Sequence, residues 1–282
     1  MTARLPLPGV LAAGPEKNDT QKEYETIREA FRRMIFNWEN DAERKDIIED
    51  IITLRCSFLI DRALRGLRLD LGQALDILRN HNDFTTERDR WQRDVLVAAI
   101  DNLVDFAAAE EFALLEELPD EPQTDKIAEY EALCERYNSV YACKENEQVV
   151  FAASVAAWWL TIDSGSIVTF MTQGDERVRA WHLSLEGVSY RKSEFPAELI
   201  PPIEWGCRCF LVADGFASVS GAFPVSKELR QHVDPVFAES LATGGRIFSP
   251  AHAYFSKPLP EYVLQIVKRI KEKFHYAQDN FR

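Results

Sequence analysis

The chain has 282 residues, of which 46% are hydrophobic and 28% are charged, a composition typical of a folded protein with one large or two modest domains. Its 33 Lys and Arg residues are outnumbered by 46 Asp and Glu residues, which gives a formal net charge of −13. The composition excludes a mainly disordered chain, and the sign of the charge excludes a basic coat for binding nucleic acid.

The acidic excess lies entirely in the first half of the chain. Residues 1–150 contain 19 basic and 32 acidic side chains, whereas residues 151–282 contain 14 of each. Because the first half repels phosphate, we expect it to bind protein partners rather than DNA.

Residues 1–19 are expected to form a flexible arm. Residues 1–14 contain one Arg, two prolines and no sustained apolar run. A secretory signal or a transit peptide has a longer apolar or amphipathic segment, so neither is expected here.

Residues 20–145 are predicted to form a helical region. Thr20 followed by Glu23 matches the sequence of a capping box, so the first helix is expected to begin at Thr20. Apolar side chains then recur at spacings of three and four residues, as on helices with one buried face, with Gly66 and Gly72 as weak points. These apolar positions are Ile27, Phe31, Met34, Ile35, Trp38, Ile47, Ile51, Leu54, Phe58, Leu64, Leu67, Leu71, Leu75 and Leu78.

Several residues predict where the helices break. Asn40 and Asp41 interrupt the first periodic run, and a turn is expected at residues 81–83. Thr86 is placed to cap the next helix, which ends in acidic residues before Pro119 stops it. The acidic residues of that helix end are Glu110, Glu111, Glu116 and Glu117.

Two further helices are predicted at residues 124–137 and 146–160. The second is apolar on almost every side, which is typical of a helix buried in the core. The uncharged stretch at residues 148–162 is shorter than the roughly 20 residues that a membrane-spanning helix requires. No membrane span is therefore expected.

Residues 146–282 are predicted to form a small mixed α+β domain, which makes the whole chain α+β. After the apolar helix, Gly and Pro residues divide short apolar runs, and strands are expected at residues 167–170 and 209–212. Helical periodicity returns at residues 226–241 and again at residues 258–276, where it forms a C-terminal helix.

Polar functional groups are crowded into residues 174–209, where turn-forming residues replace regular periodicity. Such crowding indicates a fixed constellation rather than a variable loop. The residues concerned are Asp175, Arg177, Arg179, His182, Gly187, Cys207, Arg208 and Cys209.

The residue types leave three interpretations of this cluster open. In the first, His182, Cys207 and Cys209 bind zinc, because imidazole and thiolate groups suit that metal. Asp175, His252 or a water molecule would then complete the site.

In the second interpretation, Cys207 is a nucleophile, His182 is its base, and Arg208 lowers the pKa of the thiol. In the third, His182 and the arginines tie loops to a small sheet through hydrogen bonds and ion pairs, and the cysteines are small buried apolar residues.

The number of cysteines bears on the compartment. Five cysteines in a chain of this length are too few for a disulfide scaffold, and an odd number leaves at least one thiol outside any intrachain pair. We therefore expect a reducing compartment, in which Cys207 and Cys209 do not form a disulfide.

The crowded segment also carries a family resemblance. The order Asp-x-Arg-Val-Arg-x-x-His, then Leu-x-Gly, then Pro-Pro, then Gly-Cys-Arg-Cys resembles the signature of the phage Mu F-like minor head proteins, also called phage head morphogenesis proteins. The matching positions are Asp175, Arg177, Val178, Arg179, His182, Leu185, Gly187, Pro201, Pro202, Gly206, Cys207, Arg208 and Cys209. The resemblance covers about residues 150–212, and members of the family also place a helical part before the motif.

The resemblance implies a minor structural component of a tailed-phage or prophage capsid. Such a protein lies near the portal, binds portal or capsid proteins, and acts in head assembly or in the fate of packaged DNA. It is made in the bacterial cytoplasm and then enters the virion. The resemblance implies an α+β motif domain at residues 146–282 and no secure catalytic activity, so that the motif residues organise structure.

Two other classes of function compete with this one. A metal-dependent hydrolase or nuclease, acting as a toxin or effector, would use His182 and the two cysteines as ligands and Glu176 or Glu186 as general base. An interaction module would bind a partner through the acidic helices. DNA contact would have to come from the basic C-terminal helix, with Lys268, Arg269, Lys271 and Lys273.

Overall fold

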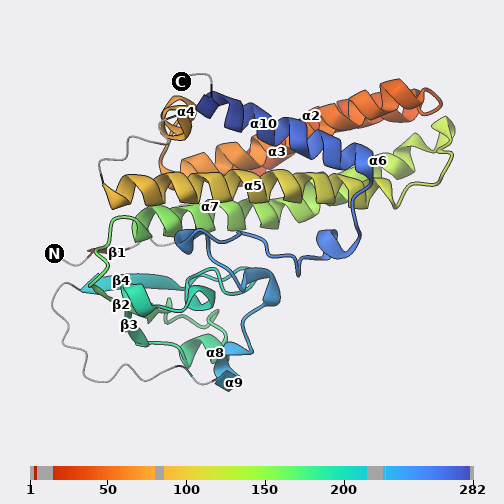
Figure 1. Ribbon diagram of the computed structural model, residues 1–282. Helices are drawn as coiled ribbons and strands as arrows, with labels where there is room; N and C mark the ends of the chain where they lie inside the picture. The colour runs from red at the N-terminus through yellow and green to blue at the C-terminus, as the bar shows by residue number, and fades with distance from the viewer. Residues whose placement is uncertain (1–2, 5–14, 80–85, 215–224, 226, 280–282) are drawn as a thin grey trace.

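The computed structural model describes residues 3–4, 15–79, 86–214, 225 and 227–279. As predicted, the fold is α+β: a body of long helices is followed by a small antiparallel sheet with loops and short helices. In Figure 1 the helices fill the upper part of the view, and the sheet lies below α5 and α7.

The helical body contains six helices from the first part of the described chain and the C-terminal helix. Their bounds are α2 Pro15–Phe36, α3 Asp41–Leu67, α4 Leu71–Arg79, α5 Glu87–Leu115, α6 Ile127–Glu135, α7 Ala142–Trp159 and α10 Glu261–Asp279. A short 3-10 turn, Thr124–Lys126, precedes α6, and a π-helical segment, Arg136–Tyr141, joins α6 to α7.

The first helix begins earlier than predicted. It starts at Pro15, since proline is tolerated in the first turn of a helix, so residues 15–19 are not part of a flexible arm. Thr20 is not a cap but a buried residue within α2. Its hydroxyl accepts a hydrogen bond of 2.9 Å from Asn146 in α7 and another of 3.3 Å from Arg62 in α3.

Other predicted helix ends are confirmed. Asn40 caps α3 by accepting from the backbone of Glu43, and Thr86 and Asp89 form a reciprocal capping box at the start of α5. The turn predicted at residues 81–83 lies outside the described residues.

Gly66 is not a weak point of α3 but the place where α3 meets α7. A Cβ atom at this position would lie 2.5 Å from the Cβ of Ala153 and 2.7 Å from the carbonyl oxygen of Val150. Only glycine lets the two helices approach so closely.

The helical body buries several charged residues. Arg55 donates to Glu110 at 2.6 Å and to Glu145 at 3.2 Å, which joins α3 to α5 and α7. Burial, and then the neighbouring charge of Glu110, raise the pKa of Glu111 to about 8. The acidic end predicted for the helix that Thr86 caps, α5, is therefore partly an interior network.

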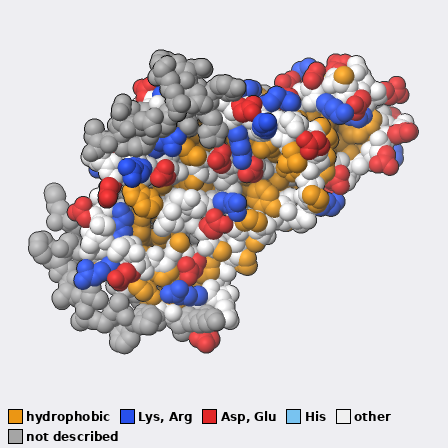
Figure 2. All heavy atoms as spheres, viewed as in Figure 1, with side chains coloured by type: hydrophobic (Ala, Val, Ile, Leu, Met, Phe, Trp, Pro, Cys, Tyr) orange, Lys and Arg blue, Asp and Glu red, His pale blue; other side chains and the backbone are white. Residues whose placement is uncertain are grey.

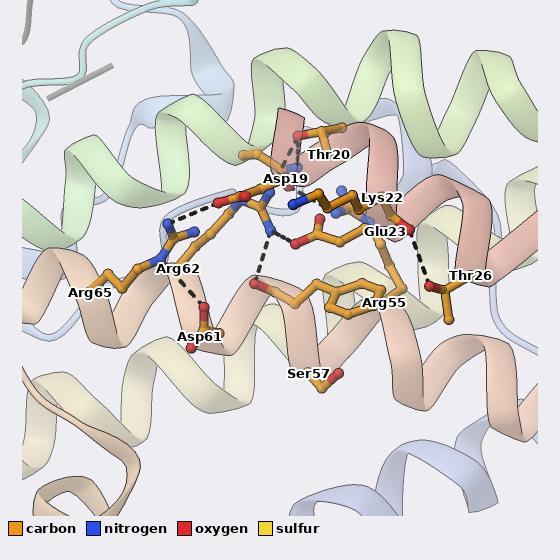
Figure 3. A network of polar contacts seen from close by, with 12 residues as sticks. Asp19, Thr20, Lys22, Glu23, Thr26, Arg55, Ser57, Asp61, Arg62 and Arg65 are labelled. Carbon is orange, nitrogen blue, oxygen red and sulfur yellow. Dashed lines mark hydrogen bonds and ion pairs between the residues drawn. The ribbon is translucent and has the colours of Figure 1, made fainter. Parts of the chain in front are cut away.

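A second buried arginine joins α3 to α2. Figure 3 shows Arg62 reaching from α3 to Glu23 and Thr20, with contacts of 2.5 and 3.3 Å, beside the more exposed pair of Arg65 and Asp19. Because Arg62 is fully buried, this contact fixes the pairing of the first two long helices.

The sheet has four antiparallel strands in the order β1-β4-β2-β3. Their bounds are β1 Ala3–Arg4, β2 Ile167–Met171, β3 Ser189–Arg191 and β4 Phe210–Asp214. The strands predicted at residues 167–170 and 209–212 are thus confirmed to within about two residues at each end. Met171 pairs with Phe210, so the end of β2 and the start of β4 lie at the same edge of the sheet.

Of the two helices predicted near the C-terminus, one is wrong. Within the described residues 227–241 the only α-helix is the four-residue α9, Lys227–Arg230. Pro235, which has no N–H for a helical hydrogen bond, starts a short 3-10 turn capped by Asp234. The C-terminal helix predicted at residues 258–276 is confirmed as α10, which begins at Glu261.

The sheet region and the helices share one hydrophobic core. Asn102 of α5 is buried and accepts from the backbone N–H groups of Ile247 and Phe248 while it donates to the carbonyl of Phe248. The boundary expected between residues 145 and 146 falls inside α7. No helix among the described residues is long and apolar enough to cross a membrane.

Candidate functional site

The two halves of the motif meet at one edge of the sheet. Residues 172–187 follow β2 and residues 204–209 precede β4, and these two strands pair in antiparallel fashion. The sheet register therefore brings together segments that lie about 30 residues apart in the sequence.

The first half is a loop that closes back on β2. The backbone N–H of Thr172 donates to the Glu186 carboxylate at 2.6 Å, and the N–H of Gly187 donates to the carbonyl of Phe170 at 2.9 Å. Gly187 has a φ of 79°, a conformation that glycine adopts without strain. Within this loop the short helix α8, Ala180–Leu183, carries His182.

Asp175 and Arg208 join the two halves on the outside. The guanidinium donates two hydrogen bonds, of 2.5 and 2.8 Å, to the two carboxylate oxygens. The hydrogen bonds from Arg208 hold the pKa of Asp175 below its usual range. Gln173 adds a hydrogen bond of 2.8 Å from its side chain to the carbonyl of Arg208.

His182 joins the two halves on the inside. Its side chain is buried, with Nδ1 lying 3.1 Å from Sγ of Cys209 and Nε2 lying 2.6 Å from Oε1 of Glu204. The Trp181 ring stands edge-on to the imidazole at a centroid distance of 4.2 Å. Burial, and then the charge of Arg179, lower the pKa of His182 to about 4, so the imidazole is neutral near pH 7.

Both ring nitrogens of His182 face polar partners. A neutral imidazole has one donor and one acceptor nitrogen. The Nδ1–Sγ pair with Cys209 has hydrogen-bond geometry, whereas Nε2 and Oε1 of Glu204 form a close polar contact without it.

Arg179 supports this arrangement from the surface. It lies 2.9 Å from the Glu204 carboxylate and donates to the backbone carbonyl of Trp205 at 2.7 Å. Burial raises the pKa of Glu204, although the charge of Arg179 opposes that shift. Glu204 is thus held between the imidazole and a guanidinium.

Cys207 and Cys209 are both buried, and both are free thiols. Burial is the largest influence on Cys207 and opposes its ionisation, but hydrogen bonds from the Cys209 thiol and from the backbone of Ile203 and Cys209 together lower the pKa of Cys207. The hydrogen bond between the two thiols, together with burial, raises the pKa of Cys209. The two sulfur atoms lie within 4.8 Å of each other.

The structure weakens the hypothesis that Cys207 is a nucleophile. The thiol beside His182 belongs to Cys209, and the Arg208 guanidinium is directed at Asp175 rather than at a sulfur atom. Both thiols are also buried, whereas a reactive cysteine requires access to its substrate.

The donor atoms of His182, Cys207 and Cys209 all lie within 4.8 Å of one another. Neither of the additional protein ligands considered from the sequence joins them. Asp175 is engaged by Arg208, and His252 lies in an aromatic cluster, 5.0 Å from the Phe106 ring by centroid distance.

The space beside the cluster is small. A cavity of about 10 Å³ is lined by residues of both halves, among them Gln173, His182 and Cys209. This is about the volume that one water molecule requires, and it does not admit a substrate. Glu186, considered as a general base, already accepts a backbone hydrogen bond, and Glu176 is exposed.

Most of the residues singled out from the sequence do lie together. Asp175, Arg179, His182, Arg208 and the two cysteines all take part in contacts within or between the two halves. Arg177 differs, because its backbone N–H bonds to Asp175 while its side chain is exposed.

Sequence analysis missed two residues of the site. Glu204 contacts His182, and Gln173 bonds to the backbone of Arg208. The position of Glu204, between Pro202 and Cys207 inside the second half of the motif, was the available signal.

No family model matches the chain, and neither the curated proteins nor the solved structures contain a match.

Proposed function

We propose that this chain is a minor head protein of a phage or prophage, bound near the portal and acting in capsid assembly or in the fate of packaged DNA, without enzymatic activity. The observation that supports the proposal is the meeting of the two motif halves. Asp175 bonds to Arg208, and His182 contacts Cys209, so the residues of the resemblance are partners in space as well as matches in sequence.

This meeting distinguishes the proposal from a chance match. Short Arg, His and Cys motifs occur by coincidence in unrelated chains, but nothing in a coincidence requires their side chains to contact one another. Here the contacts run from the first half to the second and include buried and exposed groups. They support a domain whose motif residues organise its structure, as the resemblance implies.

The partners are portal or capsid proteins, which the acidic helices would contact. DNA is a less favoured partner, because the cations of α10 already have acidic neighbours. Arg269 donates to Glu49 at 3.1 Å, and Lys271 lies 2.8 Å from Asp105. On the face shown in Figure 2, basic and acidic side chains are interspersed.

The small cavity beside His182 also favours a structural role over the alternative, a metal-dependent hydrolase or nuclease. A hydrolase needs space for a substrate next to the metal and a free general base. The cavity of about 10 Å³ offers room for a single water molecule.

The composition of purified particles tests the proposal. Procapsids and virions from an induced culture of the source strain are separated on a density gradient, and the chain and the major capsid protein are quantified by mass spectrometry. We expect the chain in both particle types, in few copies relative to the major capsid protein. A chain found only in the soluble fraction, with particles that lack it, would contradict the proposal.

A matched pair of variants links particle binding to the motif. Asp175→Ala combined with Arg208→Ala removes the outer contact between the halves, whereas Asp76→Ala combined with Arg79→Ala removes an exposed ion pair in α4. We expect the first variant to be depleted from particles and the second to be incorporated normally. Equal incorporation of both variants would show that the contact between the motif halves is not needed for binding to the particle.

A further inference from the structure

We propose that His182, Cys207 and Cys209 bind one zinc ion, with the imidazole supplied by the first half of the motif and the two thiolates by the second. The three donor atoms lie within 4.8 Å of one another, and all three side chains are buried. The proposal does not rest on the function proposed above, since it concerns only these side chains.

The donor set suits zinc. Imidazole and thiolate ligands together favour zinc over the hard cations, which prefer oxygen. With Zn–N and Zn–S bonds of about 2.0 and 2.3 Å, tetrahedral geometry separates the nitrogen and sulfur atoms by roughly 3.6 Å. The distance from Nδ1 of His182 to Sγ of Cys209 is 3.1 Å. Side-chain rotations that move these two atoms apart by about half an ångström would therefore make room for the ion.

The surroundings of His182 are those of a metal ligand. Histidine ligands usually give their second nitrogen to a carboxylate, which fixes the ring and makes the ligating nitrogen more basic. Glu204 lies 2.6 Å from Nε2 in a close contact without hydrogen-bond geometry, and Nδ1, on the other side of the ring, lies 3.1 Å from Sγ of Cys209. Arg179, at 2.9 Å, holds Glu204 in place.

The charges and the available space also fit. Binding converts two thiols into two thiolates and releases two protons to solvent, so the two negative charges balance Zn²⁺ and the buried centre stays neutral. The cavity of about 10 Å³ next to His182 and Cys209 has room for one water molecule, which would be the fourth ligand.

The test uses the full chain, purified without a metal-affinity tag and analysed for metals by mass spectrometry. We expect one zinc per chain. After chelation and reconstitution with cobalt, we expect the absorption bands of thiolate-bound Co²⁺. Protein that is folded by circular dichroism, contains no metal, and gives no such bands with cobalt would overturn the proposal.

Variants locate the ion. Cys209→Ser removes a ligand and should abolish the thiolate–cobalt bands, whereas Cys143→Ser, which removes a half-buried thiol in α7, should leave them unchanged. Glu204→Gln keeps all three ligands and should weaken zinc binding by about 10- to 100-fold, as loss of a carboxylate behind a histidine ligand does. Cobalt bands that persist in folded Cys209→Ser protein would place the metal elsewhere and refute the assignment.

Discussion

Arg208 donates two hydrogen bonds, of 2.5 and 2.8 Å, to Asp175, 33 residues earlier in the chain. Each residue belongs to a different half of the motif, and the register of β2 and β4 brings them to one edge of the sheet. The buried contact of His182 with Cys209 repeats this relationship inside the domain.

Replacement of Arg208 by Lys should lower the thermal unfolding midpoint slightly. A lysine ammonium cannot form two parallel hydrogen bonds to one carboxylate, and both side chains are partly exposed, so the effect is modest. Differential scanning calorimetry of the variant checks this. Arg246→Lys is the control and should leave the midpoint unchanged, because the Arg246 guanidinium makes only a long contact of 3.5 Å with Glu239.

Replacement of His182 by Ala should reduce the free energy of unfolding by about 1–3 kcal/mol, because a buried hydrogen-bonding group loses its partners. Urea denaturation measures the change. Leu183→Ala alters the next residue, which is 51% exposed, and should have little effect. If the urea midpoint of His182→Ala equals that of the unmodified protein, the imidazole has no structural role.

Stability should fall as the pH decreases from about 6.5 to about 4. Burial lowers the pKa of His252 from 6.5 to about 4. Between these values His252 binds more protons in the unfolded chain than in the folded chain, so acid favours unfolding, by at most roughly 3 kcal/mol. Urea denaturation at pH 7 and pH 5 tests this, and His252→Gln should reduce the difference. An identical pH dependence in that variant would show that His252 does not contribute.

Gly66→Ala should destabilise the protein by about 1–3 kcal/mol, although alanine is the better helix former. The new methyl group would lie 2.5 Å from the Cβ of Ala153, where α3 and α7 touch. Gly72→Ala is the matched control, since in α4 the methyl group would meet only an Asp70 side-chain oxygen, at 3.2 Å. The urea midpoints of the two variants should shift in opposite directions or by clearly different amounts. Equal shifts would contradict the prediction.

Arg55→Ala should reduce the free energy of unfolding by about 3–5 kcal/mol, because it leaves the Glu110 and Glu145 carboxylates buried without their cation. Arg65→Ala, at a position 39% exposed in the same helix, should cost under about 1 kcal/mol. Thermal unfolding followed by circular dichroism compares the two variants. Similar losses would mean that the interior network is not what stabilises the helical body.

Local patterns in the sequence were enough to predict much of this structure. Apolar spacing predicted the helices, and Thr86 marked a cap, because both signals act over a few neighbouring residues. The crowding of Asp175, His182 and Arg208 indicated a constellation before any contact was known.

What the sequence could not predict depends on distant partners. Arg55 meets Glu110 and Glu145 at separations of 55 and 90 residues, so its burial leaves no local pattern. Thr20 looked like a cap because its neighbours fit one, yet Asn146, 126 residues away, determines its role. Glu204 was likewise missed because its partner, His182, belongs to the other half of the motif.

The central claim, that the two halves of the motif meet at one point, is tested most directly by X-ray absorption at the zinc edge of the purified full chain. We predict a first shell with two sulfur atoms at about 2.3 Å and a histidine nitrogen at about 2.0 Å, and the loss of one sulfur atom in Cys209→Ser. A shell made only of oxygen and nitrogen atoms, unchanged in that variant, would contradict the account.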